Sequence, residues 1–250
     1  MSRETDTAGE LAAFPAGWER CLAVVAHPDD LEYGAAAAVA VWTEQGKHVS
    51  YLLVTRGEAG IDGREPGECA PLREREQRES AAAVGVESVE FLDGYPDGVI
   101  EYGPGLRRDI AAAIRRHRPE VVLTLNHRET FGGTVLNSPD HRAVGQAALD
   151  AVGDAGNRWI FPELSREGPA PWDGVRWVAV AASPRPTHAV DVTDGLERGV
   201  RSLLAHRAYI EGLTCEDPES YARAFLTGNA EAAAARFGGR PAATFEVFAR

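Results

Sequence analysis

The chain has 250 residues, of which 44% are hydrophobic, and it carries a formal net charge of −12. A chain of this length and composition can bury a full core, so we expect one domain. The acidic balance argues against nucleic acid or an anionic membrane as the main partner, because both select basic surfaces. Three cysteines leave one unpaired in any disulfide scheme, which favours a reducing compartment.

The first 17 residues mix acidic residues with small ones. They contain neither a basic start nor an apolar run long enough for export or membrane spanning. We therefore expect a flexible segment over 1–17, a single domain over 18–250, no transmembrane segment and a cytoplasmic protein.

Strand-like and helix-like patterns alternate along the chain. In chain order they predict a strand at 21–26, a helix at 34–46, a strand at 48–55, a helix at 72–84, a strand at 89–92, a helix at 104–117, a strand at 121–125, a helix at 139–152, a strand at 175–182, helices at 193–210 and 218–236, and a strand at 243–249. A glycine- and proline-rich stretch from 56 to 71 predicts a long loop. The alternation predicts an α/β protein with a Rossmann-like three-layer fold, in which helices cover both faces of a mostly parallel sheet.

Polar residues follow the predicted strands at the ends where parallel sheets bind ligands, at 27–30, 55–58, 93–97 and 126–129. The densest of these segments is His27-Pro28-Asp29-Asp30, which follows a buried strand and is followed closely by Glu32. Capping the next helix would require only one of its aspartates. The concentration of one imidazole and several carboxylates therefore indicates a metal site.

A hydrolytic zinc site needs three protein ligands and an open position for water. His27 and Asp30 can converge on one ion, so a third ligand must come from another part of the chain. The best candidate is His141, in a segment that reads as a helix start with Ser138 as the N-cap and Pro139 in the first turn. A lone histidine at a helix start is more often a surface or capping residue, so this assignment depends on the first motif.

Two motifs together resemble those of the PIG-L/LmbE-like family of zinc-dependent N-deacetylases. They are Ala26-His27-Pro28-Asp29-Asp30-Leu31-Glu32-Tyr33-Gly34 and Pro139-Asp140-His141. The resemblance also covers 55–60, 73–76 and 95–98, and it runs through the first 150 residues or so. The family includes N-acetylglucosaminyl-phosphatidylinositol deacetylases and enzymes of mycothiol and bacillithiol metabolism.

The resemblance implies zinc ligands at His27, Asp30 and His141 and a general base at Asp29. Zinc would lower the pKa of a bound water and polarise an amide carbonyl while the nearby carboxylate accepts a proton. Another divalent transition metal stays open, because nitrogen and oxygen ligands alone do not select zinc.

The resemblance further implies that Arg73 and Asp97 contact the sugar of the substrate, and Arg56 is a third candidate for substrate binding. Glu32 is expected to hydrogen-bond a ligand or the turn, or to complement the charge of the helix N-terminus.

Ser138 departs from the family pattern, in which a histidine at this position stabilises the oxyanion or protonates the leaving group. His127 is the nearest substitute by topology and His206 the next, and Asp140 would then orient one of them. Loss of an oxyanion donor typically costs on the order of 100-fold or more in rate. Another group substitutes, or the protein is slower, differently specific or inactive.

The sequence thus predicts a metal-dependent hydrolase that removes an N-acyl group, most simply acetyl, from a small-molecule amino sugar or its conjugate. One alternative is an amidase for a larger acyl or thiol conjugate, for which the region 155–175 would have to leave a wider cleft. The other is a non-catalytic metal- or sugar-binding relative, which Ser138 keeps open. The sequence does not decide whether the chain forms a homo-oligomer.

Overall fold

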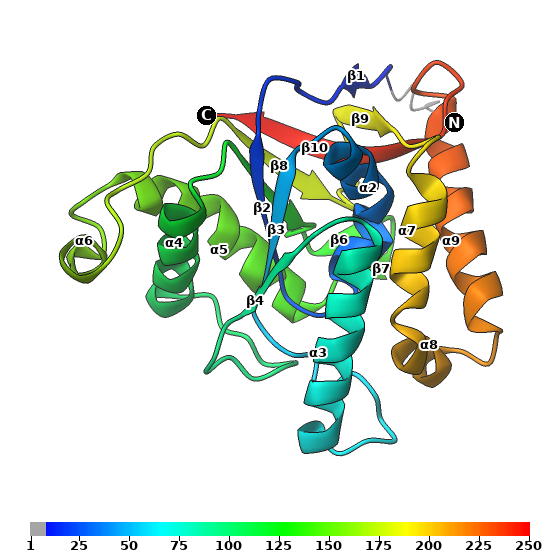
Figure 1. The fold of residues 1–250 in the computed structure, drawn as a ribbon, viewed down its shortest axis with the longest axis horizontal. Helices are drawn as coiled ribbons and strands as arrows, with labels where there is room; N and C mark the ends of the chain where they lie inside the picture. The colour runs from blue at the N-terminus through cyan, green and yellow to red at the C-terminus, as the bar shows by residue number, and fades with distance from the viewer. Residues whose placement is uncertain (1–8) are drawn as a thin grey trace, which may run out of the picture.

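The computed structural model describes residues 9–250, with the backbone alone at Glu167. An eight-stranded sheet runs through it (Figure 1). Its strands are β1 (Ala12–Ala13), β2 (Arg20–Val25), β3 (His48–Leu53), β4 (Ser88–Phe91), β5 (Val121–Leu125), β8 (Trp177–Ala181), β9 (His188–Asp191) and β10 (Ala242–Ala249). The spatial order is β1-β9-β10-β8-β5-β2-β3-β4. Strands β4, β3, β2, β5 and β8 are parallel to their neighbours in this series, and β10 is antiparallel to β8 and β9.

Helices cover both faces of this sheet, which confirms the predicted fold class. They are α1 (Asp30–Gly34), α2 (Ala36–Glu44), α3 (Pro66–Ala83), α4 (Pro104–His117), α5 (Pro139–Gly156), α6 (Pro162–Glu167), α7 (Leu196–Leu204), α8 (Arg207–Leu213) and α9 (Pro218–Ala234). Helices α4 and α5 lie on one side of the sheet, and α2, α7 and α9 lie on the other (Figure 1). A short hairpin, β6 (Thr130–Gly132) and β7 (Val135–Leu136), precedes α5.

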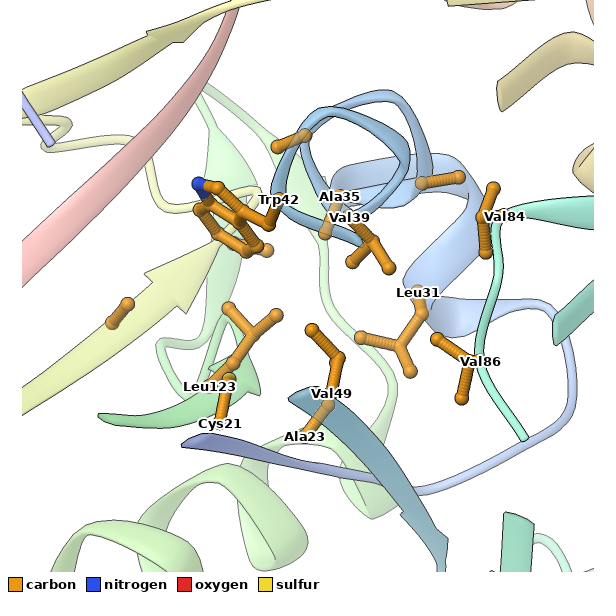
Figure 2. Close-up of a cluster of buried hydrophobic side chains, with 14 of the residues drawn as sticks. Cys21, Ala23, Leu31, Ala35, Val39, Trp42, Val49, Val84, Val86 and Leu123 are labelled. Carbon is orange, nitrogen blue, oxygen red and sulfur yellow. The ribbon is translucent and has the colours of Figure 1, made fainter. Parts of the chain in front are cut away.

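The core is divided by the sheet into two layers, and β2 contributes to both. Leu22 and Val24 pack in the layer of α4 and α5, whereas Cys21 and Ala23 pack in the layer of α2. Figure 2 shows the second layer, in which Trp42 of α2 lies over the strands. Because both faces are buried from Cys21 to Val25, these positions must be apolar, which explains the unbroken apolar run there.

The structure also contains elements that the sequence did not predict, namely α6, β1, β6, β7 and β9, and two predicted helices have clearly different bounds. Helix α3 begins at Pro66 instead of at 72, and Pro71 lies inside it. Pro66 stands in the first turn, where a missing N–H costs nothing, and Pro71 removes only one helical hydrogen bond, which the buried side chains of the helix outweigh. The predicted helix 193–210 is interrupted at His206, the N-cap position of α8.

Part of the expected flexible segment, 1–17, packs against the domain. Leu11 is 5% exposed, β1 pairs with β9, and the ring of Phe14 lies 5.3 Å from that of Phe245. Residues 1–8 lie outside the described part of the chain. Within 9–250, no helix combines the length and the apolar character that crossing a bilayer requires.

Candidate active site

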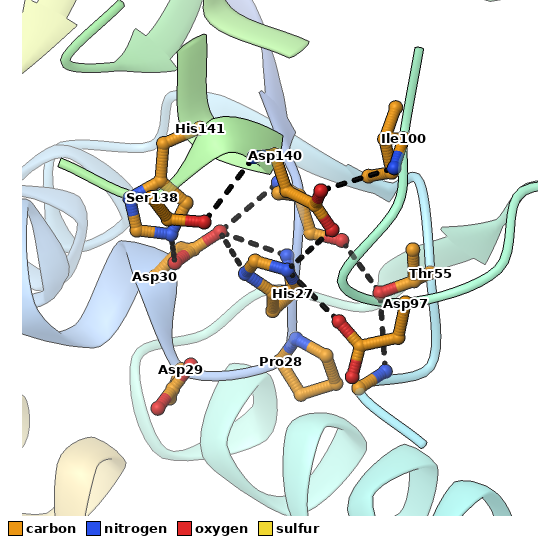
Figure 3. A network of polar contacts seen from close by, with 12 residues as sticks. His27, Pro28, Asp29, Asp30, Thr55, Asp97, Ile100, Ser138, Asp140 and His141 are labelled. Atoms are coloured by element: carbon orange, nitrogen blue, oxygen red, sulfur yellow. Dashed lines mark hydrogen bonds and ion pairs between the residues drawn. The ribbon is translucent and has the colours of Figure 1, made fainter. Parts of the chain in front are cut away.

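Three potential metal ligands meet where the carboxyl end of β2 approaches the first turn of α5 (Figure 3). His27 and Asp30 belong to the turn after β2, and His141 belongs to α5. Ser138 caps that helix as predicted, because its Oγ accepts the N–H of Asp140 at 3.2 Å. One donor atom from each of His27, Asp30 and His141 lies within 4.8 Å of the others, so these residues could hold one ion.

The carboxylate of Asp30 lies between the two imidazoles. Its Oδ1 is 2.9 Å from Nε2 of His141, and its Oδ2 is 3.6 Å from Nδ1 of His27. The same Oδ2 accepts the backbone N–H groups of Ala26 and His27 at 3.0 and 2.8 Å. Asp30 therefore closes the turn after β2 and directs its other oxygen at α5.

The imidazole of His141 is oriented by Asn137. The side-chain NH₂ of Asn137 donates to the carbonyls of Asn126 and Arg128 at 2.6 and 2.9 Å, so its Oδ1 is the acceptor that faces His141. Nδ1 of His141 lies 2.9 Å from that oxygen. Nδ1 therefore carries a hydrogen, and Nε2 is the nitrogen that faces Asp30 and that a metal ion would bind. No sequence pattern had pointed to Asn137.

The imidazole of His27 is held by two carboxylates on its outer side. Its Nε2 lies 3.0 Å from Asp97 and 3.2 Å from Asp140. Asp140 is fully buried and also accepts the N–H groups of Gly98 and Ile100 at 2.7 and 3.0 Å. The expectation that Asp140 orients His127 or His206 is therefore wrong, because its oxygens face His27 and the 98–100 backbone instead.

These donors suit a divalent metal ion. Two imidazole nitrogens and one carboxylate form a set that zinc takes in hydrolytic sites and that other divalent transition metals also accept. His27, Asp97 and Asp140 form a second candidate group around the same histidine. Three of the four oxygens in that second group already accept backbone N–H groups, so the group with Asp30 and His141 fits an ion better.

The charges of the cluster shift the pKa values of its members. Burial alone would raise the pKa of Asp30, but the positive charges of His141 and His27 hold it well below its ordinary value. Burial alone would lower the pKa of His27, yet Asp30, together with Asp140 and Asp97, raises it well above its ordinary value. A metal ion bound here would take the place of any proton on the liganding nitrogens.

Asp29 stands next to the metal-ligand group in a strained conformation. Its φ of 93° lies in the left-handed region, which costs a residue other than glycine about 1–3 kcal/mol and is typical of functional sites. Its N–H donates to Oε1 of Gln77 at 3.0 Å, and its carboxylate lies 3.2 Å from the guanidinium of Arg73. Burial raises the pKa of Asp29 to about 6, although Arg73 opposes the shift. Asp29 occupies the N-cap position of α1, but its side chain makes no capping hydrogen bond, so the capping alternative does not hold for it.

Arg73 is buried behind Asp29 and does not project into an open cleft. Its guanidinium donates to the carbonyls of Gly57 and Pro28 at 3.1 and 2.5 Å and lies 4.1 Å from the ring of Tyr209. Gly57 has a φ of +63°, and a Cβ there would collide with the guanidinium. Arg73 therefore has structural partners on several sides. The expected contact between Arg73 and the sugar of the substrate stays a prediction.

Glu32 belongs to a buried polar network on the far side of this turn. Its Oε1 accepts from Gln77 at 2.9 Å and from Ser80 at 2.5 Å, and its Oε2 lies 3.6 Å from His206. Glu32 thus supports the turn through Gln77, which also binds the backbone of Asp29. His206 faces this network, so the structure does not bring it to the metal-ligand group.

Arg56 lies further out, on the rim of the site. It forms ion pairs with Asp93 at 3.0 Å and Glu74 at 3.5 Å, and it lines a shallow depression together with Glu58 and Tyr95. These contacts do not test whether Arg56 binds the substrate, so this role stays a prediction.

A family model for PIG-L, described as GlcNAc-PI de-N-acetylase, matches residues 22–152. The matched region is more than half of the chain and includes His27, Asp30 and His141. The chain belongs to the PIG-L family. A diacetylchitobiose deacetylase from Thermococcus kodakarensis is 30% identical to it over 211 residues, which cover 82% of this chain and 75% of that protein.

A second relative agrees with this assignment to the PIG-L family, and a solved structure shares the fold. A 1D-myo-inositol 2-acetamido-2-deoxy-alpha-D-glucopyranoside deacetylase from Kineococcus radiotolerans is 32% identical over 224 residues, which cover 74% of this chain and 58% of that protein. The structure of N,N'-diacetylchitobiose deacetylase from Pyrococcus horikoshii matches with a TM-score of 0.82 at 24% identity, over 93% of this chain and 84% of that one. The latter similarity establishes the fold.

In this PIG-L chain, neither candidate for the missing histidine contacts the metal-ligand group. His127 follows β5 and packs closely against α5. A Cβ added to Gly145 of that helix would lie 2.8 Å from the Cβ of His127. Within residues 9–250, its buried Nδ1 has no hydrogen-bond partner, and no ion pair joins it to the cluster. Ser138 is occupied as the helix cap.

Proposed function

We propose that the chain is a metal-dependent hydrolase that removes an N-acyl group, in the simplest case acetyl, from an amino sugar or a conjugate of one. The observation that carries the proposal is the convergence of His27, Asp30 and His141 beside Asp29 in a member of the PIG-L family. The names of the relatives support an amino-sugar substrate, since diacetylchitobiose and a 2-acetamido-2-deoxy-glucopyranoside both contain N-acetylglucosamine.

His27, Asp30 and His141 would hold the ion, with zinc as the first candidate. When bound, zinc polarises an amide carbonyl and lowers the pKa of a bound water toward neutrality. Asn137 and Asp140 act as positioning residues, because they bind the outer nitrogens of His141 and His27 and so fix their tautomers and ring directions.

Asp29 is the proposed general base. A carboxyl group with a pKa of about 6 exchanges protons readily near neutral pH. Asp29 takes a proton from the attacking water as the water oxygen bonds to the carbonyl carbon, and it then gives this proton to the amine nitrogen as the C–N bond breaks. Arg73 pairs with the carboxylate and fixes its direction. We assign no catalytic role to Ser138 or His127.

Metal removal and Asp29→Asn test this proposal. The protein is stripped with a chelator, reloaded with Zn²⁺ and assayed for acetate release from N-acetylglucosamine and diacetylchitobiose. Turnover should disappear on stripping and return on reloading, and Asp29→Asn should lower kcat by about 10²- to 10⁴-fold with metal still bound. Asp194→Asn is the matched control, because Asp194 is exposed and is not among the residues assigned to the site.

Full metal-dependent turnover in Asp29→Asn would show that another group is the base. A wild-type protein that binds Zn²⁺ but releases no acyl group from any N-acylated amino sugar would support the non-catalytic alternative.

A further inference from the structure

An apolar cavity of about 580 Å³ opens beside the metal-ligand group. Asp30 and His141 form part of its wall. Alanine, valine, leucine and phenylalanine side chains form most of the rest, and nine of them, including Phe131 and Phe225, come from α2, α9, β10 and the β6–β7 hairpin. Among the described residues, Asp30 and His141 are the only wall residues with a side chain that can carry a formal charge near neutral pH.

The cavity is far larger than an acetyl group requires. A methyl group is about the size of a water molecule, whose share of liquid volume is about 30 Å³. A volume of 580 Å³ lies within the range of about 300–1,000 Å³ that is typical of pockets for whole small-molecule ligands. The space next to Asp30 and His141 therefore suits a group with many more carbon atoms than acetyl.

The opposite side of the metal-ligand group is polar. Nε2 of His27 faces Asp97, whose N–H donates to Glu58, and Glu58 lines the shallow depression with Arg56. Successive contacts through Glu58, Asp97 and His27 thus connect this depression with Asp30, which lines the apolar cavity. A substrate with its amide at the metal-ligand group would have a polar side and an apolar side available at the same time.

We propose that the cavity binds the acyl chain of the substrate, and that the protein hydrolyses amino sugars with N-linked aliphatic chains longer than acetyl. The inference rests on the proposed function and specifies its substrate class. Water adds its oxygen to the carbonyl carbon, the C–N bond breaks, and the products are a fatty carboxylate and a protonated amino sugar. The sugar lies on the Asp97 side, and the chain extends between α2 and α9.

A series of substrates on the zinc-loaded protein tests the chain length. N-acetyl-, N-butyryl-, N-hexanoyl- and N-octanoylglucosamine are compared by kcat/KM. Burial of each methylene should raise kcat/KM by about fourfold until the cavity is full. The highest value for the N-acetyl compound, with a steady fall along the series, would overturn the proposal.

Variants of α9 locate the chain. Ala230 lines the cavity and is 4% exposed, so Ala230→Leu fills part of the space. It should lower kcat/KM for N-octanoylglucosamine by tenfold or more and leave the N-acetyl value within about twofold. Phe225→Ala enlarges the cavity and should move the optimum to longer chains. Ala232→Leu, at an exposed position of the same helix, is the matched control and should change neither value.

Binding of octanoate, measured by calorimetry, gives a readout that does not depend on turnover. The wild-type protein should bind octanoate with a negative heat-capacity change, and Ala230→Leu should weaken binding by about tenfold. Equal binding by both proteins would overturn the assignment of the cavity. The assignment would also be overturned if kcat/KM rose with an octyl group on the glycosidic oxygen of N-acetylglucosamine but did not rise with the length of the acyl chain. Octanoate binding that Ala230→Leu weakens, without hydrolysis of any substrate in the series, would retain the cavity and refute the proposed function.

Discussion

The turn after β2 and the start of α5 both reach the metal-ligand group, but they are held in different ways. The turn depends on distant parts of the chain: Gln77 and Arg73 of α3 bind Asp29. The start of α5 is held by its neighbours in sequence, with Ser138 as its cap and Asn137 bound to carbonyls less than twelve residues away. Asp29 thus depends on the tertiary structure, whereas the cap of α5 and the side chain of Asn137 depend on the local sequence. Asp140, in the same turn of α5, still binds the distant Gly98 and Ile100.

The largest effect is expected in the first segment, from Asp30→Asn. This change removes the carboxylate that lies between the two imidazoles. Zn²⁺ affinity should fall on the order of 10²- to 10³-fold. This factor corresponds to the share of one ligand in the binding free energy of a structural zinc site. Competition with a chromophoric chelator measures it. An unchanged affinity would mean that the ion is bound elsewhere, for example by His27, Asp97 and Asp140.

Asp140→Asn tests the link between the two segments. Asp140 lies in α5 but contacts Nε2 of His27 in the first segment. Without the carboxylate of Asp140, the imidazole of His27 should be held less firmly. Loss of such a partner typically weakens metal binding by 10- to 100-fold. Asp150→Asn provides the control on the same helix, because the Asp150 carboxylate contacts the exposed Tyr102 and Gln146. Equal Zn²⁺ affinities in the two variants would contradict the positioning role of Asp140.

Ser138→Ala distinguishes a helix cap from a catalytic group. Loss of the bond to the N–H of Asp140 should lower the free energy of unfolding by about 1 kcal/mol. Because the cap is local, kcat should stay within a few-fold of the wild-type value. Urea unfolding and the deacetylation assay measure the two quantities. A drop of 100-fold in kcat without a loss of stability would assign Ser138 to the chemistry.

The smallest effects are expected at the cysteines, which lie outside both segments. Cys21 and Cys69 are buried and Cys215 is exposed. Burial raises the pKa of the Cys21 thiol and so suppresses its reactive thiolate. A thiol reagent should modify one equivalent rapidly, at Cys215, without a change in turnover. Rapid modification of two or more thiols in the folded protein would show that the core opens more easily than its packing indicates.

The metal-ligand candidates could be predicted because their signals are short in sequence. His27 and Asp30 are three residues apart, and the capping pattern at Ser138 placed His141 in the first turn of a helix. The partners of these residues could not be predicted in the same way. Nothing in the sequence around Asn137 or Gln77 indicates that one orients His141 and the other binds the backbone of Asp29.

The boundaries that the prediction missed have a similar cause. Pro71 is a helix-breaking signal when the sequence is considered locally, yet it lies inside α3 because the burial of that helix outweighs one missing hydrogen bond. His206 looked like a catalytic substitute, but the fold turns it toward Glu32.

The alternation of strands and helices and the metal-ligand candidates could be inferred from the sequence, because they depend on residue types at short spacings, and the departure at Ser138 followed from the resemblance to the family. Which side chains support these residues depends on the folded chain. Asp140 binds His27 and Arg73 binds Asp29 because strand ends and helices distant in sequence meet at one edge of the sheet. The apolar cavity beside Asp30 and His141 has the same origin, since α2, α9 and β10 come together only in the folded chain.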